Sequence, residues 1–121
     1  MKLRYLAFVC FFTASSLSHA QSISYVDSFG SYGNLAGQFD QPWGIDVDAS
    51  GDVYVADWQN QRIQKFDSDG NFKGMLAASN LVNIHGIAIA PSGRVFTSQS
   101  SDIRIKEFSS DLQYLTGFGT F

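Results

Sequence analysis

Residues 42–72 read PWGIDVDASGDVYVADWQNQRIQKFDSDGNF and contain four short segments of strand-forming residues separated by turn residues. The first segment alternates apolar and polar side chains, and an Ala-Ser-Gly-Asp turn connects it to the second segment, residues 53–56, which predicts a β-hairpin. The third and fourth segments, residues 62–67 and 72–76, follow turns that contain Asn, Asp, Ser and Gly. The pattern therefore predicts a four-stranded antiparallel sheet.

The same unit recurs 42 residues further along the chain. Over residues 44–72 and 86–114, ten of twenty-nine positions are identical without a gap. Four antiparallel strands repeated at a period near 40 residues are typical of the blades of a β-propeller. We therefore predict an all-β fold with two four-stranded blades, residues 42–77 and residues 78–121, of which the second is degenerate.

The third strand of each unit interrupts the strict alternation of apolar side chains. Ile63 and Phe66 lie three residues apart, and so do Ile105 and Phe108 in the second unit. A strand with a period of two cannot place both members of such a pair on one face. We therefore expect a β-bulge or a sharp twist near this point in both blades.

The first unit closely resembles the NHL repeat. The matching residues are Pro42, Gly44, Ile45, Val47, Asp48, Gly51, Val53, Tyr54, Val55, Ala56, Asp57, Asn60, Arg62, Ile63, Gln64, Phe66, Asp69, Gly70 and Phe72. The second unit departs from the pattern at Ile84, Gln99, Asp102 and Leu112. The resemblance implies a propeller of about six blades, and two blades cannot close such a ring, so we expect an incomplete propeller.

The segment before the first unit, residues 21–41, is predicted to hold an orphan outer strand and an inter-blade linker. Residues 25–30 are similar to residues 114–119, so residues 22–29 are predicted to be the outer strand of a blade that is otherwise absent. The linker contains Gly30, Gly33 and Gly37, which predict a flexible turn.

The first twenty residues have the order of a secretory signal peptide. Lys2 and Arg4 precede an apolar run, and a small-residue stretch ends at Ala20. The apolar run is shorter than the 20 or so residues that a membrane span needs. This pattern predicts cleavage after Ala20 and a secreted or periplasmic location.

Removal of residues 1–20 leaves six basic and eleven acidic side chains, so the predicted net charge is −5. An acidic chain without a run of Lys or Arg lacks the positive surface on which nucleic-acid binding and anionic membrane binding depend. Cleavage also removes the single cysteine, Cys10. We therefore predict neither nucleic acid nor membrane as a partner, and no disulfide.

Asp57, Asn60 and Arg62 form the most conspicuous polar group of the first unit. They flank a turn between two predicted strands, where Asp and Asn bond the backbone and Arg can connect the turn to a neighbouring segment. Arg104 takes the place of Arg62 in the second unit. We interpret the four residues as structural and assign no catalytic residue.

Asp46 and Asp48 lie on one face of the first predicted strand of the unit, where two carboxylates could bind Ca²⁺ or act as acid and base. The second unit has alanine at both corresponding positions, Ala88 and Ala90, and Asp48 precedes the turn. We therefore favour a structural role for this pair and assign neither a metal nor a cofactor.

Trp58, Trp43 and His85 are the candidate ligand-binding residues. Both tryptophans lie next to predicted strands, where an exposed aromatic ring can anchor a partner. His85 takes the place of Trp43 in the second unit. The resemblance to NHL-like lyases, in which histidines near this point hold a metal, makes His85 a candidate ligand as well, but a zinc site needs three protein ligands.

These observations favour binding over catalysis. We predict an exported propeller segment that serves as a scaffold for a protein or a small-molecule ligand. The alternatives are a part of an NHL-like propeller lyase or hydrolase with a metal site in its channel, and a truncated fragment without activity of its own. The two open blade faces also predict self-association, in which three copies complete a ring as a homotrimer.

Overall fold

The structure is a computed structural model that describes residues 25–77, 81–100 and 104–119. Within these residues it consists of strands and loops, so none of its described segments is a helix that could cross a membrane. The predicted signal peptide, residues 1–20, lies outside the described residues. The strands are β1 (Ser31–Tyr32), β2 (Gln38–Phe39), β3 (Pro42–Val47), β4 (Val53–Asp57), β5 (Arg62–Phe66), β6 (Phe72–Ala77), β7 (Ile84–Ile89), β8 (Val95–Gln99), β9 (Arg104–Phe108) and β10 (Tyr114–Phe118).

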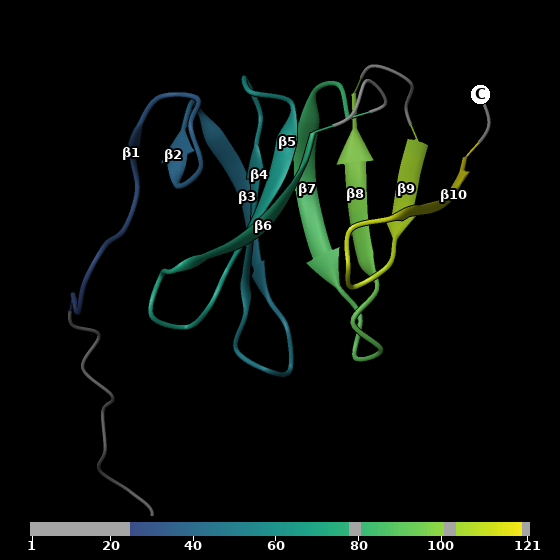
Figure 1. The fold of residues 1–121 in the computed structure, drawn as a ribbon. Coiled ribbons are helices and arrows are strands. Elements are labelled where there is room, and N and C mark those ends of the chain that lie inside the picture. The colour runs from purple at the N-terminus through teal and green to yellow at the C-terminus, as the bar shows by residue number, and fades with distance from the viewer. Residues whose placement is uncertain (1–24, 78–80, 101–103, 120–121) are drawn as a thin grey trace, which may run out of the picture.

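Eight of these strands form two four-stranded antiparallel sheets. Blade 1 has the order β3-β4-β5-β6 and blade 2 has the order β7-β8-β9-β10, so every strand pairs with its neighbour in the sequence. Figure 1 shows the two sheets side by side, with the first strands of both, β3 and β7, running in the same direction. The predicted all-β fold with two four-stranded blades is confirmed.

The turns between strands are stabilised by hydrogen bonds from backbone N–H groups to Asp carboxylates, and they contain residues in the left-handed backbone conformation. Asp48 accepts hydrogen bonds from the backbone N–H of Ser50 and Asp52, as Asn and Asp do in tight turns. Gly70 has a φ of 83° in the turn between β5 and β6, and Leu112 takes its place in blade 2 with a φ of 61°. Leu112 is nevertheless buried in the core, so packing holds a leucine in a conformation that favours glycine.

Each blade contains two β-bulges, at matching positions. On the first strands the pairing skips Trp43 between Pro42 and Gly44, and it skips His85 in the same way. On the outer strands it skips Lys73 and Leu115. The bulge predicted from the spacing of Ile63 and Phe66 is thus present, but the extra residue belongs to the outer strand that faces the third.

The two blades pack through β3 and β4 of blade 1 and β7 of blade 2. A Cβ atom added at Gly44 would lie 3.1 Å from both the carbonyl oxygen of His85 and the backbone nitrogen of Ile87, so any other residue would push the two backbones apart by a few tenths of an ångström. The carboxylate of Asp46 accepts a hydrogen bond of 2.6 Å from the backbone N–H of Ile89 across the interface. The core of the interface consists of Tyr54, Ala56, Ile63, Leu81, Ile84, Val95, Phe108 and Leu112.

The segment before β1 does not form the predicted outer strand over the residues that the structure describes. Residues 25–30 have no strand pairing, and residues 22–24 lie outside the described part. Phe29 instead packs its ring 5.0 Å from that of Phe66 on the face of blade 1 that lies away from blade 2. A strand needs a hydrogen-bonded partner, and none of the described strands pairs with this segment.

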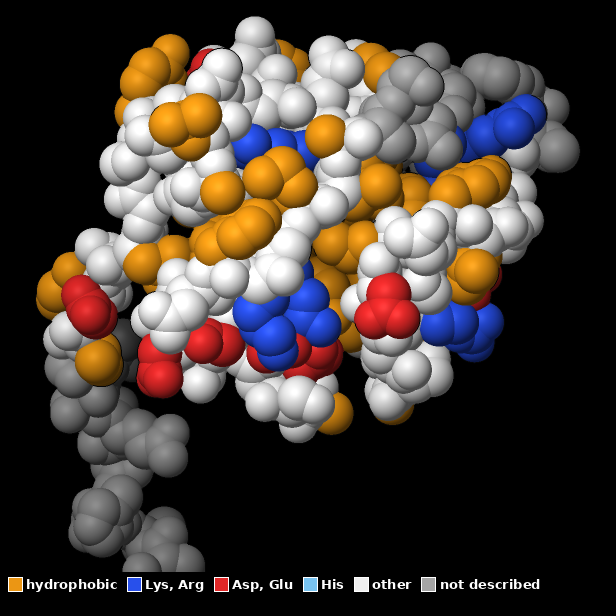
Figure 2. All heavy atoms as spheres, viewed as in Figure 1, with side chains coloured by type: hydrophobic (Ala, Val, Ile, Leu, Met, Phe, Trp, Pro, Cys, Tyr) orange, Lys and Arg blue, Asp and Glu red, His pale blue; other side chains and the backbone are white. Residues whose placement is uncertain are grey.

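Ion pairs connect neighbouring strands at the lower ends of both sheets. The acidic and basic positions of the pair are exchanged between the blades. In blade 1, Asp52 accepts hydrogen bonds from Lys73 and forms an ion pair of 3.0 Å with Lys65. These two lysines hold the pKa of Asp52 below its ordinary value. In blade 2, Arg94 takes the place of Asp52 and pairs with Glu107 at 2.6 Å. Figure 2 shows acidic and basic side chains gathered at this end of the molecule.

The close approach at Gly44 predicts the effect of one methyl group. We expect Gly44→Ala to lower the free energy of unfolding by about 1–3 kcal/mol, because the new Cβ meets backbone atoms of β7 that cannot move aside without separating the blades. The matched control is Gly74→Ala in β6, where no atom lies within 4 Å of the added Cβ and the loss of glycine flexibility is neutral to stabilising. Urea denaturation of both variants checks this, and equal effects would contradict it.

Candidate functional site

The side chain of Arg62 is buried on the face of blade 1 that lies away from blade 2, and acceptors surround it. Its Nε donates to Asp57 Oδ2 at 2.8 Å, and its two terminal nitrogens donate to the backbone oxygens of Asn34, Leu35 and Gln38. The carboxylate of Asp57 is fully buried as well. A buried guanidinium needs this degree of pairing, because the loss of hydration would otherwise dominate.

The same network fixes the linker, residues 33–40, to blade 1. Asn60 donates both to Asp57 Oδ2 and to the carbonyl oxygen of Gly33, each at 2.9 Å. Gln64, which is fully buried, accepts from the N–H of Gly37 and donates to the oxygen of Gln38. The linker that its glycines predict as a flexible turn is therefore held by side chains from β4, β5 and the turn between them.

This arrangement brings Asp57, Asn60 and Arg62 together but leaves no open space beside them for a substrate. Every charged atom of the pair faces protein, and the side chains of Asp57 and Arg62 are at most 5% exposed. The geometry suits an anchor for the linker. Asp46 and Asp48 are likewise engaged, the former with Ile89 and the latter with the turn before β4.

The second blade does not reproduce the anchor. Arg104 is exposed, and Gln99 and Lys106 take the places of Asp57 and Gln64. Lys106 donates to Gln99 Oε1 at 2.8 Å, and both side chains are largely buried. The four residues interpreted as structural from the sequence thus fall into two groups, three in one network and Arg104 at the surface.

The three candidate ligand-binding residues meet at the upper end of the blades, where β3 and β7 begin. The rings of Trp43 and Trp58 stack with centroids 5.4 Å apart and an interplanar angle of 15°. The ring of His85 meets Trp43 edge-on at a centroid distance of 4.5 Å. We call Trp58, Trp43 and His85 the aromatic row.

Two matching bulges produce the aromatic row. Trp43 and His85 are the extra residues of β3 and β7, and a bulge turns its side chain out of the regular alternation. The row crosses the boundary between the blades, because Trp43 belongs to one and His85 to the other. His85 Nε2 lies 3.0 Å from the hydroxyl of Ser100, which leaves the ring oriented by a polar neighbour.

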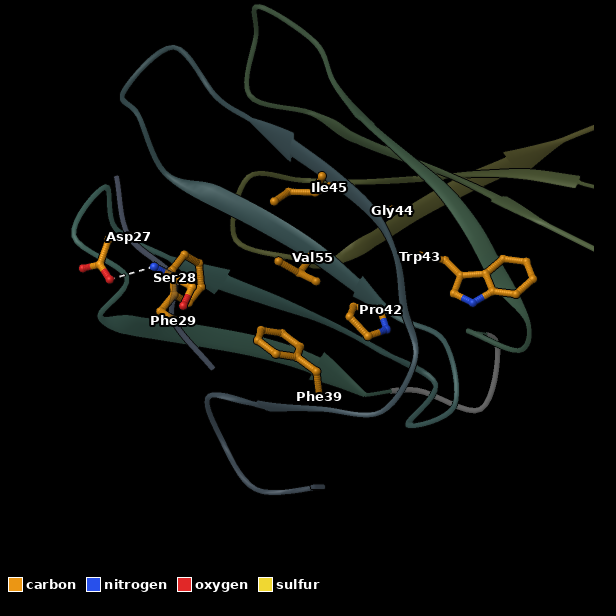
Figure 3. Close-up of a pocket in the computed structure, with 9 residues that line it drawn as sticks. All are labelled: Asp27, Ser28, Phe29, Phe39, Pro42, Trp43, Gly44, Ile45 and Val55. Atoms are coloured by element: carbon orange, nitrogen blue, oxygen red, sulfur yellow. Dashed lines mark hydrogen bonds between the residues drawn. The ribbon is translucent and has the colours of Figure 1, made fainter. Parts of the chain in front are cut away.

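A mostly apolar groove begins beside Trp43 and extends over the face of blade 1 that lies away from blade 2. Its volume is about 390 Å³, and Figure 3 shows Phe39, Pro42, Ile45 and Val55 around it, with Trp43 at one end. Trp43 itself is 55% exposed. An exposed indole next to an apolar groove is suited to contact with another molecule.

The aromatic row supports recognition through ring stacking and apolar contact more than it supports acid–base or metal chemistry. Its one titratable group is His85, whose partner is a hydroxyl. Within residues 25–77, 81–100 and 104–119, no group of three or more His, Cys, Asp or Glu side chains is placed to hold a metal ion.

Sequence reasoning missed Gln64, Gln38 and Ser100. Gln64 lies within the Arg-Ile-Gln segment of the repeat pattern, so its recurrence in the motif was the available signal. Ser100 and the backbone oxygen of Gln38 carry no signal, because their roles depend on contacts between segments that are far apart in sequence.

Comparison with known proteins matches this chain to one repeat family. The sequence model described as NHL repeat matches residues 39–66. Protein brain tumor of Drosophila melanogaster is 32% identical over 106 residues, which cover 82% of this chain and 10% of that protein. B-box type zinc finger protein ncl-1 of Caenorhabditis elegans is 47% identical over 53 residues, 44% of this chain and 6% of that protein.

E3 ubiquitin-protein ligase TRIM71 of Rattus norvegicus is 49% identical over 45 residues, 37% of this chain and 5% of that protein. This chain therefore spans a tenth or less of the length of these relatives. Among solved structures, a streptogramin B lyase superposes with a TM-score of 0.60 and 17% identity over 72% of this chain and 29% of that chain. This likeness shows the fold, a β-propeller of which the present blades form a part.

The relatives correct the predicted location. Brain tumor, ncl-1 and TRIM71 are intracellular cytoplasmic proteins, so the prediction of a secreted or periplasmic protein is wrong. An apolar run between basic and small residues satisfies the signal-peptide pattern through composition alone, and that composition also occurs in chains that stay inside the cell.

The buried anchor predicts unequal effects of one substitution at two equivalent positions. We expect Arg62→Gln to lower the free energy of unfolding by about 3–5 kcal/mol, because Asp57 and three carbonyl oxygens lose their donor in a buried place. Arg104→Gln is the matched control, and we expect a change below about 0.5 kcal/mol, since Arg104 is exposed. Urea denaturation measures both, and limited proteolysis of Arg62→Gln should cut within residues 33–40 first. A stable, protease-resistant Arg62→Gln variant would contradict the anchor.

Proposed function

Because this chain belongs to the NHL-repeat family, we propose that it is a propeller scaffold that recognises a protein partner through the aromatic row at the upper end of its blades. The observation that carries the proposal is the meeting of Trp58, Trp43 and His85 across the blade boundary. The partner's side chains would pack against the exposed edge of Trp43 and enter the adjoining groove.

The physical character of the row supports recognition. Tryptophan contributes a large contact area at a small cost in side-chain entropy, and it is enriched among residues that dominate binding energy. Stacking on Trp58 and the edge contact with His85 hold Trp43 in place before a partner arrives. A rigid anchor loses less entropy on binding than a mobile one.

The relatives favour a protein over a small molecule as the partner. TRIM71 is named an E3 ubiquitin-protein ligase, a name that describes an enzyme acting on proteins. This chain covers 5% of that relative, so the ligase activity itself is not transferred. The groove also lies open along a blade face, which suits an extended peptide segment.

A lyase or hydrolase function is the second reading from the sequence, and it has weaker support. The streptogramin B lyase is 17% identical to this chain, and an identity this low supports a shared fold but not a shared activity. His85 is the single histidine of the described residues, and its ring contacts Trp43 and Ser100.

Selection of peptides from a random library displayed on phage tests the proposal. We expect peptides selected on the full chain to bind Trp43→Ser and Trp58→Ser at least about 30-fold more weakly, because each change removes a stacked ring from the contact surface. The selected peptides, made by synthesis, are titrated against each variant by fluorescence anisotropy.

Tyr32→Ser is the matched control, since Tyr32 is an exposed aromatic residue of β1 that shares no ring contact with the row within the described residues. Circular dichroism of each variant checks that the sheets remain folded. Peptides that bind both tryptophan variants as tightly as the unchanged chain would place recognition elsewhere and contradict the proposal.

A further inference from the structure

We propose that copies of this chain join head to tail, with the open face of blade 1 in one copy packed on the open face of blade 2 in the next. This inference does not rest on the partner-recognition role, and a second copy on this face of blade 1 would cover the groove beside Trp43. The inference rests on the apolar face of blade 2, on the part of the blade 1 face around Ile45 and Val47 that Phe29, Phe39 and the linker leave exposed, and on the interface that already joins the two blades within one chain.

The open face of blade 1 is the face turned away from blade 2. Ile45 pairs with Val55 and Val47 pairs with Val53, and residues directly opposite each other share a face of the sheet. Ile45 is 66% exposed and Val47 is 51% exposed, although both belong to β3, the strand of blade 1 that packs against β7 of blade 2. Figure 3 shows Ile45 and Val55 on this face, at one side of the groove.

The open face of blade 2 is turned away from blade 1. Ala88 pairs with Phe96 and Gly86 pairs with Ser98, so these residues share the face opposite to that of Ile87 and Ile89. Together with Ile105 they line a shallow hollow of about 180 Å³ whose exposed surface is almost entirely apolar. A hollow of this kind can receive side chains from a facing sheet.

The interface within the chain shows how two such faces fit. Blade 1 presents Gly44, Tyr54 and Ala56 to blade 2, and their counterparts 42 residues later are Gly86, Phe96 and Ser98, which are half-buried. Blade 2 presents Ile87, Ile89 and Val95 to blade 1. Their counterparts are Ile45 and Val47, which are exposed, and Val53, which is half-buried. The open face of blade 2 therefore resembles the face of blade 1 that packs against blade 2. The open face of blade 1 likewise resembles the face of blade 2 that packs against blade 1.

One contact of the internal interface has no equivalent between copies. Asp46 accepts the N–H of Ile89, but Ala88 takes the place of Asp46 on the open face of blade 2. The glycine that permits the close approach is retained, as Gly86. The contact between copies is therefore apolar and lacks a charge-assisted hydrogen bond, so it is weaker than the internal one and depends on protein concentration.

Head-to-tail joining would also extend the aromatic row. Within one chain Trp43 of blade 1 contacts His85 of the blade that follows it. A copy placed ahead of blade 1 would bring its own His85 to the beginning of β3, beside Trp43, because Trp43 and His85 occupy equivalent bulges of the repeat. The aromatic row would then contain residues of both copies, while the groove of blade 1 would lie under the second copy.

Sedimentation velocity of the full chain, with two variants that each block one face, tests the proposal. We expect the unchanged chain to form species larger than a monomer as its concentration rises. Ile45→Asp blocks the blade 1 face and Phe96→Asp blocks the blade 2 face, and each variant alone should be a monomer, with self-association weakened about 100-fold or more by an unpaired buried charge.

A mixture of the two variants distinguishes head-to-tail joining from symmetric pairing. Ile45→Asp keeps its blade 2 face and Phe96→Asp keeps its blade 1 face, so an equimolar mixture should form a dimer with one copy of each and nothing larger. Leu35→Asp is the control, because it places the same charge on an exposed leucine of the linker and not on a strand of either sheet.

Three outcomes would overturn the proposal. The first is an unchanged chain that stays monomeric at all concentrations, and the second is a mixture that stays monomeric. The third is a Leu35→Asp variant that loses assembly as completely as the face variants.

Circular dichroism checks folding, and a second pair, Val47→Lys with Ile105→Lys, repeats the test if an aspartate variant unfolds. A defined trimer would mean that three copies, with two blades each, close into a ring, and a broad size distribution would mean an open head-to-tail chain.

Discussion

A guanidinium group that leaves water must find acceptors for its donors, and Arg62 finds them in one carboxylate and three carbonyl oxygens. The carbonyl oxygens belong to the linker, so the pairing of Arg62 determines the path of the chain as it approaches blade 1. The N–H of Asp40 then bonds Asp57, which sets the start of β3 and the position of Trp43. The aromatic row therefore depends on a charge that lies on another strand and never reaches the surface.

The strands of both blades could be predicted from the sequence, because a period of two and turn residues are local signals. Residues 53–56 and 62–67 match β4 and β5 within a residue. The bulges at Trp43 and His85 could not be located, since a bulge depends on which residue of the partner strand lies opposite. The predicted strand at 22–29 failed over residues 25–29 because its hydrogen-bonding partners are not among the described strands.

The sequence identified Trp43, Trp58 and His85 separately but not as a group. Their contact depends on two bulges and on the packing of β3 against β7, and neither can be seen in a single strand. Asp57, Asn60 and Arg62, in contrast, could be predicted as a group, because their spacing around one turn indicated mutual contact. Their acceptors in residues 33–38 were hidden, because glycine-rich linkers carry no pattern that distinguishes a mobile segment from a pinned one.

The pairing of every blade strand with its neighbour in sequence has a consequence for how the chain folds. Each hairpin closes a short loop, so a blade has a low contact order and can form quickly. Contacts between blades join residues about forty positions apart, as Asp46 and Ile89 do, and therefore form later. During synthesis blade 1 leaves the ribosome first and stays exposed on its Tyr54 face until blade 2 arrives. In that interval a second nascent copy can supply the missing blade, so the folding order itself offers a route to exchange of blades between chains.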